Sequence, residues 1–539
     1  MSINKKIIIA ALAGIVFGVS SCKKFLNVNK NPNGAQTATL KTLLPAAELL
    51  VGSAQGVDLE IDGSFFAQYW TQSPGASQYH NLDQYAPSQD AFSNPWTNLY
   101  AAAENFYQLY KLADSQKAHN YMAISLLMRA YTFQLITDGW GSAPFSQALK
   151  GQYADGHLVN PSYDQQDSIY MGIIAMIDSA NALIDLTSPT YPKSDDLIYG
   201  KVAAASGMNV MTYWQEFANT LALRVYMRMS AINPGAAQAG IAALYATSPV
   251  FIGTNAGDDA FIAYGTSSAN ENPLYAEEVG LGFVQNIVGS GSCLDTMLVE
   301  GDPRINIFYE PVTPGGTNFV GLPQGLYAVA YTGYSYPSFV VAADAQNTQS
   351  TGGYTSGNAP VNFITSYESL FLQAEAAARG WSGVAAGTDA TLFQQAIAAN
   401  FNYYSGQFTA ITGSSGATQY TNYMAANSYW TQYPTGGTTQ QKVQYIITQK
   451  YFSMCGNQGF EAWTEWRRTG YPNWFVISVS SITGNPSTYN AATGVYTPSY
   501  YNSSTPYPKR FYYPSSESTV NSSFPGLQPL TSKVWWDVL

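Results

Sequence analysis

The chain contains few charged residues. They make up 11% of its 539 residues, against about 25% in typical soluble domains. Lys and Arg number 23 against 34 Asp and Glu, so the formal net charge is −11. The sequence has no basic stripe, which a protein needs to compensate the phosphates of nucleic acid. We therefore expect no nucleic-acid partner.

Histidine is also rare, which limits the chemistry that the chain can perform. None of the three His (His80, His119 and His157) lies in a metal-ligand spacing such as H-E-x-x-H. The sequence contains no nucleophile elbow G-x-S-x-G and no P-loop. The pair Asp258 and Asp259 in a Gly-rich stretch is a weak indication of a structural Ca²⁺. With that exception left open, we expect no enzyme activity, no metal and no cofactor.

Cysteine occurs only three times, at Cys22, Cys293 and Cys455. This number is too small for a disulfide framework. Cys293 and Cys455 lie far apart in the sequence, and we interpret them as two buried thiols. Their pairing in an oxidising compartment remains the alternative.

Long apolar runs are confined to the N-terminus. Lys5 and Lys6 precede an apolar stretch at 7–19, and small residues lead from there to Cys22. This order resembles a bacterial lipoprotein signal, which implies cleavage before Cys22 and acylation, as by palmitate, of its thiol and new amino group. The alternative is a buried or transmembrane helix, but the stretch is shorter than the roughly 20 residues of a span. We therefore expect a signal peptide at 1–21, a lipidated flexible tether at 22–35 and a single domain at 36–539.

Aromatic and uncharged polar residues take the place of the missing charge. Tyr occurs 41 times and Trp 11 times. Aromatic faces stack on the C–H faces of sugars, and amides hydrogen-bond to hydroxyl groups. Many secreted proteins share this composition, so it favours a neutral, hydroxyl-bearing ligand only weakly.

Apolar residues recur at helical spacing in much of the chain. The segments 92–113 and 118–136 are joined by a short polar turn, which predicts an antiparallel helix pair. We predict a mainly α fold in which TPR-like helix pairs form a scaffold with long irregular loops and a few short strands. The predicted helices are 40–52, 59–70, 92–113, 118–136, 165–186, 211–232, 366–380, 391–405 and 440–454.

Long loops rich in Gly, Ser, Thr, Asn and Tyr interrupt these helices. Structureless loops of this length are usually functional or disordered, and their aromatic content argues against disorder. We expect them to pack on the scaffold and to form the binding surface. The loops are 73–91, 256–272, 313–362, 412–439 and 478–523.

Aromatic residues in these polar loops are the candidate ligand residues. Each of them can stack on a sugar, and packing of the loop itself is the alternative role. The first group is Trp70, Tyr79, His80, Asn81 and Tyr85, the second is Tyr331, Tyr334 and Tyr336, and the third is Tyr429, Trp430 and Tyr433.

Five segments in one order resemble a known family. They are 22–32 (Cys, then Phe-Leu and Asn-Pro), 129–145 (a helix followed by Gly-Ser-Ala-Pro), 368–380 (with Ala-Glu-Ala-Ala), 449–470 (with Gly-Phe-Glu-Ala-Trp) and 508–517 (P-x-R-x-x-Y-P-x-x-E). In this set the chain resembles the SusD/RagB family of Bacteroidetes outer-membrane lipoproteins, within its SusD-like branch.

The resemblance implies a function and a location. It implies a lipoprotein on the outer membrane, facing the exterior, that captures a nutrient, above all a glycan or oligosaccharide. It also implies transfer of that nutrient to a partner TonB-dependent β-barrel transporter (SusC-like), over which the protein would lie as a lid. The alternatives are a peptide-binding member of the same family, a surface-anchored glycan hydrolase and a purely structural lid.

The segments that carry the resemblance are rich in charged and aromatic residues. We predict a structural role for them, because Arg side chains over Trp faces and Arg–Glu pairs lock a helix in place. A charged ligand clamp is the alternative. The residues are Glu461, Trp463, Trp466, Arg467, Arg468, Arg510 and Glu517.

Overall fold

Helices dominate the structure, a computed structural model. It describes residues 38–152, 155–268, 270–280, 285–327, 329–330, 332–344, 350–475, 488–490, 495–497 and 507–538. The predicted signal peptide (1–21), Cys22 and the tether (22–35) lie outside the described residues.

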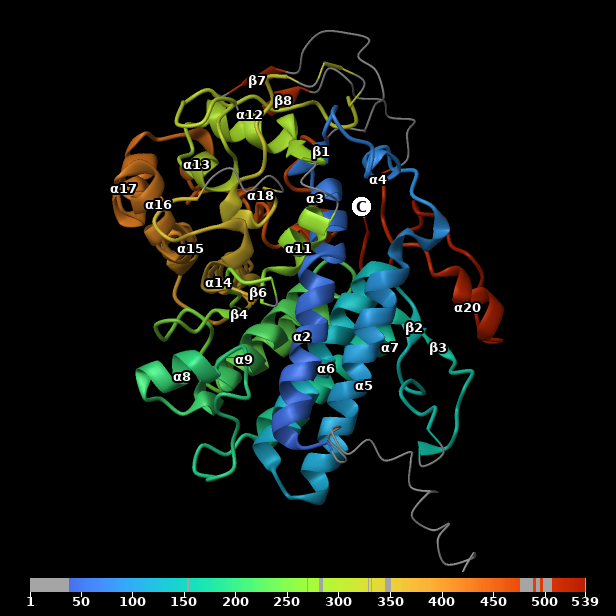
Figure 1. Ribbon diagram of the computed structural model, residues 1–539. Helices are drawn as coiled ribbons and strands as arrows, with labels where there is room; N and C mark the ends of the chain where they lie inside the picture. Colours follow the sequence, from blue (N-terminus) through green and yellow to red (C-terminus); the bar gives the residue numbers. More distant parts are fainter. Residues whose placement is uncertain are drawn as a thin grey trace, which may run out of the picture.

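Two groups of helices form the scaffold (Figure 1). In the first, α2, α5, α6 and α7 pack against one another in turn, and in the second α14 packs against α15 and α18. This arrangement confirms the predicted mainly α fold. The helices are α2 (Leu40–Gly56), α3 (Asp58–Phe66), α4 (His80–Asp83), α5 (Ser93–Ser115), α6 (His119–Trp140), α7 (Gln166–Leu183), α8 (Gly200–Ser206), α9 (Val210–Arg228), α10 (Pro234–Ala246), α11 (Pro273–Gly280), α12 (Gly291–Val299), α13 (Ile305–Phe308), α14 (Ser366–Ala378), α15 (Thr388–Tyr403), α16 (Ser405–Thr412), α17 (Gly416–Ala425), α18 (Thr439–Ser453), α19 (Gly459–Thr469) and α20 (Ser515–Val520).

The helix α6 lies at the centre of the first group. Almost all of its side chains are buried, on every face. A helix that is apolar all round must be covered on all sides, and α5, α7, α2 and α9 all contact it. The predicted pair of helices at 92–113 and 118–136 is therefore present as α5 and α6.

The strands are short and pair two by two. They are β1 (Trp70–Gln72) with β5 (Ile287–Gly289), β2 (Ala143–Pro144) with β3 (Tyr163–Asp164), β4 (Ala260–Ile262) with β6 (Val361–Ile364), and β7 (Thr488–Asn490) with β8 (Val495–Thr497), all antiparallel. The pairs β1–β5 and β4–β6 join segments about one hundred residues or more apart, whereas β7 and β8 belong to the same loop. The pair β1–β5 brings the loop after residue 72 beside the segment before residue 287, where the Ser73 amide donates to the backbone oxygen of Asn286.

The helix α3 packs unusually closely against α19. A Cβ atom at Gly63 would overlap the backbone nitrogen of Phe460, and one at Gly459 would overlap Ser64. Glu60 accepts a hydrogen bond from the Gly459 amide at 3.0 Å. Because the two backbones touch at these glycines, this face of α3 is fixed against α19 and its opposite face is free for other contacts.

The structure corrects one predicted helix end. The sequence predicts a helix at 59–70, but α3 ends at Phe66. Gln68 has a positive φ of 56°, a conformation that no helix continues through. Trp70 consequently lies in β1.

The long loops contain more helix than the sequence predicts. The loop 73–91 contains α4 and the 3₁₀ helix η2 (Gln89–Phe92), and the loop 412–439 contains α17 and η6 (Tyr429–Thr431). Two further 3₁₀ turns, η4 (Phe339–Val341) and η5 (Ser356–Asn358), lie in the loop 313–362. In the described part of the chain, no helix is long and apolar enough to cross a membrane.

Candidate functional site

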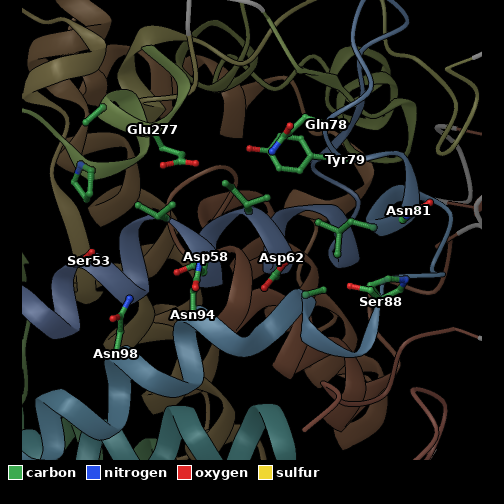
Figure 2. Close-up of a pocket in the computed structure, with 17 residues that line it drawn as sticks. Ser53, Asp58, Asp62, Gln78, Tyr79, Asn81, Ser88, Asn94, Asn98 and Glu277 are labelled. Carbon is green, nitrogen blue, oxygen red and sulfur yellow. The ribbon is translucent and has the colours of Figure 1, made fainter. Parts of the chain in front are cut away.

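A cavity of about 720 Å³ lies where the loop after β1 meets the scaffold. Its walls come from α2, α3, the loop at 78–91, the beginning of α5 and α11 (Figure 2). Two of the predicted ligand residues, Tyr79 and Asn81, line it. We call it the acidic cavity, and its polar lining residues are Ser53, Asp58, Asp62, Gln78, Tyr79, Asn81, Ser88, Asn94, Asn98 and Glu277.

Three carboxyl groups make the cavity acidic. Asp58 and Asp62 lie four residues apart on one face of α3, as Figure 2 shows, and Glu277 comes from α11. Burial, and then the charge of Glu277, raise the pKa of Asp58 to about 6, although Asn94 donates a hydrogen bond to it. Burial, and then Asp58, raise the pKa of Asp62 well above its usual range. The negative charges of these carboxyl groups are thus poorly compensated by the rest of the folded chain.

Tyr79 forms one wall of the cavity. Its hydroxyl donates to Glu278 Oε1 at 2.8 Å, and its amide donates to Gln72 Oε1 at 2.6 Å. Its ring packs against Phe65 of α3, with 5.4 Å between the ring centroids. These contacts orient the ring and leave it only partly exposed.

An aromatic pair lies next to the cavity. His80 stacks on Tyr327 with 3.6 Å between the ring centroids and 19° between the ring planes. Gln84 donates to the Tyr327 hydroxyl at 2.8 Å. Both rings are half-buried, and Asn81 beside them is exposed. An aromatic face can stack on a ring, and an exposed amide can donate and accept hydrogen bonds beside it.

Asp83 holds this region together. Its carboxyl accepts from Thr71 Oγ1 at 2.9 Å and from Gln324 Nε2 at 2.7 Å. The Gly325 amide also donates to Thr71 Oγ1. The segments 70–84 and 322–327, more than two hundred residues apart in sequence, therefore form one surface.

The second predicted group belongs to the same neighbourhood. Tyr334 and Tyr336 are half-buried and pack against a small apolar cluster of Val288, Leu322 and Leu326. Leu326 immediately precedes Tyr327. Tyr331, the third member of this group, lies outside the described residues.

Three of the predicted ligand aromatics are instead buried in the core. Trp70 has 0% of its surface exposed, Trp430 has 1% and Tyr85 has 6%. A ring without exposed surface cannot stack on a ligand, so these three assignments are wrong. Trp430 packs against Trp474, Tyr445 and Tyr429, and the Tyr85 hydroxyl accepts from Gln68.

Tyr433 also has a structural environment. Its hydroxyl donates to Asp389 at 2.8 Å, and its ring lies 4.8 Å from Phe393, centroid to centroid. Its partners belong to α15, so the third predicted group lies on a different part of the scaffold from the acidic cavity. The structure does not bring it to the other two groups.

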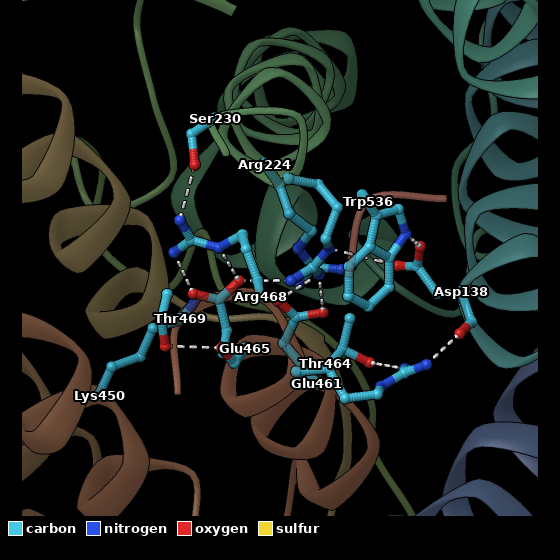
Figure 3. Close-up of polar contacts among 12 residues, drawn as sticks. Asp138, Arg224, Ser230, Lys450, Glu461, Thr464, Glu465, Arg468, Thr469 and Trp536 are labelled. Carbon is cyan, nitrogen blue, oxygen red and sulfur yellow. Dashed lines mark hydrogen bonds and ion pairs between the residues drawn. The ribbon is translucent and has the colours of Figure 1, made fainter. Parts of the chain in front are cut away.

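The charged residues of α19 form a buried ionic network (Figure 3). Arg228 contacts Glu461 at 2.6 Å, Glu465, and Asp138 at 3.4 Å. Arg468 contacts Glu375 and Glu465, both at 2.6 Å. Burial alone would raise the pKa of Glu461, but Arg228, Arg224 and Lys450 outweigh it and hold that pKa below its usual value. All of these side chains are almost fully buried, so the network lies inside the scaffold and not at the ligand surface.

Aromatic residues surround the cations of this network. The Arg467 guanidinium lies 3.5 Å from the centre of the Trp463 ring and also donates to the backbone oxygen of Asp138 at 2.7 Å. Trp466 is less buried and stacks on Phe475, with 5.3 Å between centroids. Such contacts hold α19 in one orientation.

Arg510 and Glu517 do not pair with each other among the described ion pairs. Arg510 lies 4.9 Å from the Tyr513 ring and donates to the backbone oxygen of Trp140. Glu517 accepts from the Tyr163 hydroxyl. These contacts attach the C-terminal segment to the end of α6 and to β3.

The remaining predictions concern cysteine and calcium. Cys293 and Cys455 are free and buried, with their sulfur atoms 4.0 Å apart. Asp258 accepts from the amides of Gly253 and Asn255, and Asp259 accepts from the amide of Ser366. Across the described ranges no group of three or more His, Cys, Asp or Glu is placed to hold a metal ion.

The sequence predictions missed most residues of this site, among them Asp58, Asp62, Glu277 and Tyr327. The sequence does mark Asp58 and Asp62, because acidic residues at positions i and i+4 of a helix repel each other and destabilise it. Such a pair indicates a candidate functional site. Glu277 and Tyr327 reach the site only through tertiary contacts, and nothing in their local sequence marks them.

Known proteins resemble this chain over most of its length. The SusD-like_2 family model, described as "Starch-binding associating with outer membrane", matches residues 32–493. A search of curated proteins gives no match. Among solved structures of similar fold, a chitin-binding protein is 22% identical, with a TM-score of 0.70 over 93% of this chain and 100% of that one.

Two further solved structures show the same likeness. A SusD homologue from Bacteroides fragilis is 20% identical, with a TM-score of 0.70 over 93% of this chain and 99% of that one. A chitin-binding SusD homologue from Flavobacterium johnsoniae is 22% identical, with a TM-score of 0.67 over 92% and 98%. At this identity the likeness establishes the fold.

The ionic network predicts a large loss of stability when one carboxylate is neutralised. Glu461→Gln removes one of the carboxylates that compensate the buried Arg228, and breaking a buried pair costs about 3–5 kcal/mol. Urea unfolding of the variant should show this decrease in the free energy of unfolding. The control is Asp114→Asn in the exposed Lys117–Asp114 pair, whose side chains are 75% and 55% exposed, and it should change stability by less than about 0.5 kcal/mol. Equal stability of the two variants would contradict the structural role of the network.

The burial of Trp430 predicts a loss of stability as well. Trp430→Ala removes a fully buried ring, and such truncations cost about 3–5 kcal/mol. Thermal unfolding should show a clear decrease in melting temperature. A variant that melts like the unmodified protein but binds ligand more weakly would restore the ligand role of Trp430.

Proposed function

The chain belongs to the SusD-like_2 family, whose members are described as starch-binding and associated with the outer membrane, and we propose that it captures a glycan or oligosaccharide at the cell surface. The family predicted from five sequence segments is thereby confirmed. Proteins of this family are binding proteins, and the proposal assigns this chain the same kind of role without catalysis.

The observation that carries the proposal is the surface formed by the aromatic pair and the acidic cavity. His80 and Tyr327 are stacked and half-buried, so part of each side chain is accessible to a planar or cyclic ligand. Asn81, Gln78 and Tyr79 lie beside them. Aromatic faces with amides and hydroxyls around them suit sugar rings. The cavity volume lies within the usual 300–1,000 Å³ of small-molecule sites.

We further propose that the protein works as part of a complex on the membrane. Acylation of Cys22 would anchor it, and the tether at 22–35 would let it move over the mouth of a TonB-dependent transporter of the SusC type. The two solved relatives that bind chitin support a carbohydrate as the cargo. Capture by the loops followed by transfer to the barrel is the sequence of events that this arrangement favours.

Binding of neutral polysaccharides, oligosaccharides and peptides to the chain from Cys22 onward tests the proposal. We expect calorimetry to show micromolar to millimolar affinity for one glycan class. Each mixture is also examined for new reducing ends, because a glycan hydrolase uses paired carboxylates of the kind found in the cavity. Hydrolysis, or binding of peptides alone, would replace the proposed function with one of the alternatives.

The aromatic pair gives the sharpest variants. His80→Ala and Tyr327→Ala should each weaken glycan binding by about 1–3 kcal/mol, as expected for an aromatic residue at a binding hot spot. The control is Tyr420→Ala, a half-buried Tyr on α17, which lies far from α4 (Figure 1). If only the control loses affinity, or if none of the three variants does, the ligand does not bind at the aromatic pair.

The lipid anchor is tested by Cys22→Ser. Without a thiol the chain cannot be acylated, so the protein should move from the membrane fraction to the soluble periplasmic fraction. Immunoblots of the two fractions measure this, and Ser20→Ala serves as the control for signal processing. A membrane fraction that keeps all of the Cys22→Ser protein would contradict the lipid anchor.

A further inference from the structure

The acidic cavity contains a carboxyl oxygen for which the chain itself supplies no partner. Asp62 is only 7% exposed, and its Oδ2 atom has no hydrogen-bond partner. A buried, unpaired carboxyl oxygen costs about 1–3 kcal/mol or more. Asp62 lines the cavity, as Figure 2 shows, so a ligand in the cavity can reach this oxygen.

The groups around Asp62 indicate that a ligand bound to it would be a cation. Asp58 and Glu277 line the same cavity, and the residues that line it in the described structure include no Lys, Arg or His. The ion pairs of the described residues include none of these three carboxyl groups. The three acidic side chains therefore have each other as neighbours and no positive charge among the residues that line the cavity.

The size of the cavity favours an organic cation over a metal ion. As noted above, the described residues contain no group of three acidic, His or Cys side chains that converge on one point. The cavity has room for a sugar ring, at about 720 Å³. A primary ammonium carries three N–H donors and no acceptor, which matches an enclosure whose charged groups are all acceptors.

We propose that the acidic cavity is a subsite for a primary ammonium group, that of a 2-amino-2-deoxy sugar in the captured glycan. The amino group points at Asp62 and Asp58, and Glu277 supplies a third acidic group near it. Asn94 and Asn98, which line the same cavity, carry amides that can hydrogen-bond to the ring hydroxyls. An N-acetylated sugar fits less well, because its carbonyl oxygen would face carboxyl groups. This inference rests on the proposed glycan capture and narrows its substrate class.

Titration of the cavity supports this assignment. The titratable side chains that line it are Asp58 and Asp62 on α3, Glu277 on α11 and Tyr79 in the loop, with Glu278 behind Tyr79. Burial raises the pKa of both aspartates, and repulsion by Glu277 adds to it at Asp58 and repulsion by Asp58 adds to it at Asp62. A bound ammonium reverses this effect by favouring the ionised carboxylates. Its affinity should therefore decrease when the pH decreases from about 7 to about 5, because Asp58, whose pKa is about 6, must then lose a proton to bind it.

The test compares oligosaccharides of equal length made of glucosamine, N-acetylglucosamine or glucose, each titrated into the purified protein by calorimetry. We expect the glucosamine oligomer to bind at least about tenfold more tightly than the other two. Asp62→Asn and Asp58→Asn remove charge at constant shape and should each reduce this preference by about tenfold. Glu277→Gln provides a third variant on a different helix.

Asp114→Asn is the matched control. Asp114 lies on α5 about 30 Å along the helix from Asn94, at 1.5 Å per residue, and its removal should leave all three affinities unchanged. Retention of the preference by all three cavity variants would overturn the subsite. Equal binding of charged and neutral oligomers would also overturn it, while leaving glycan capture in place.

The remaining outcomes separate this inference from the proposed function. If none of the oligomers binds, and no glycan of the wider panel does, both are overturned. A lysine-containing peptide provides the same ammonium group from another source. If it binds more tightly than the glucosamine oligomer and loses affinity in Asp62→Asn, the assignment to an amino sugar is overturned in favour of a peptide.

Discussion

Arg228 is buried in the middle of the molecule, and its charge must be compensated there. The counter-charges come from α6 and α19, through Asp138, Glu461 and Glu465. Further pairs extend this network to α14 and α18. A helix that rotates by one residue turns its side chains by about 100°, which would leave several charges buried without partners. The network therefore sets the register of five helices that lie far apart in sequence.

This constraint reaches the ligand surface through α19. The helix is held by its charges on one side, and it meets α3 at Gly63 and Gly459, where side chains would overlap the backbone. Glu60 ties the same face of α3 to the first amide of α19. Residues 58 and 62 lie about 160° around the helix from residue 60. The position of α19 thus determines that Asp58 and Asp62 face the cavity.

Sequence periodicity predicted the long helices because their apolar stripes are repeated over several turns, as in α5 and α6. It failed where a single backbone angle decides where a helix ends. At Gln68 a positive φ prevents α3 from continuing, so Trp70 lies in a strand. It also could not separate buried from accessible aromatics. Trp430 and Tyr79 both lie in polar loops, but only long-range neighbours such as Trp474 and Glu278 decide which ring is covered. The acidic cavity was missed for the same reason, since its walls come from segments far apart in the chain.

Asp83 links the two halves of the proposed binding surface, because its carboxyl accepts from both Thr71 and Gln324. The aromatic pair therefore rests on β1, which is itself paired with β5. A ligand that lies on His80 and Tyr327 meets rings whose arrangement is already set before it arrives. Little conformational entropy is then lost on association, and a few contacts suffice for useful affinity. Release of the ligand would likewise require no rearrangement of this surface, which suits the proposed transfer of a captured glycan to a partner.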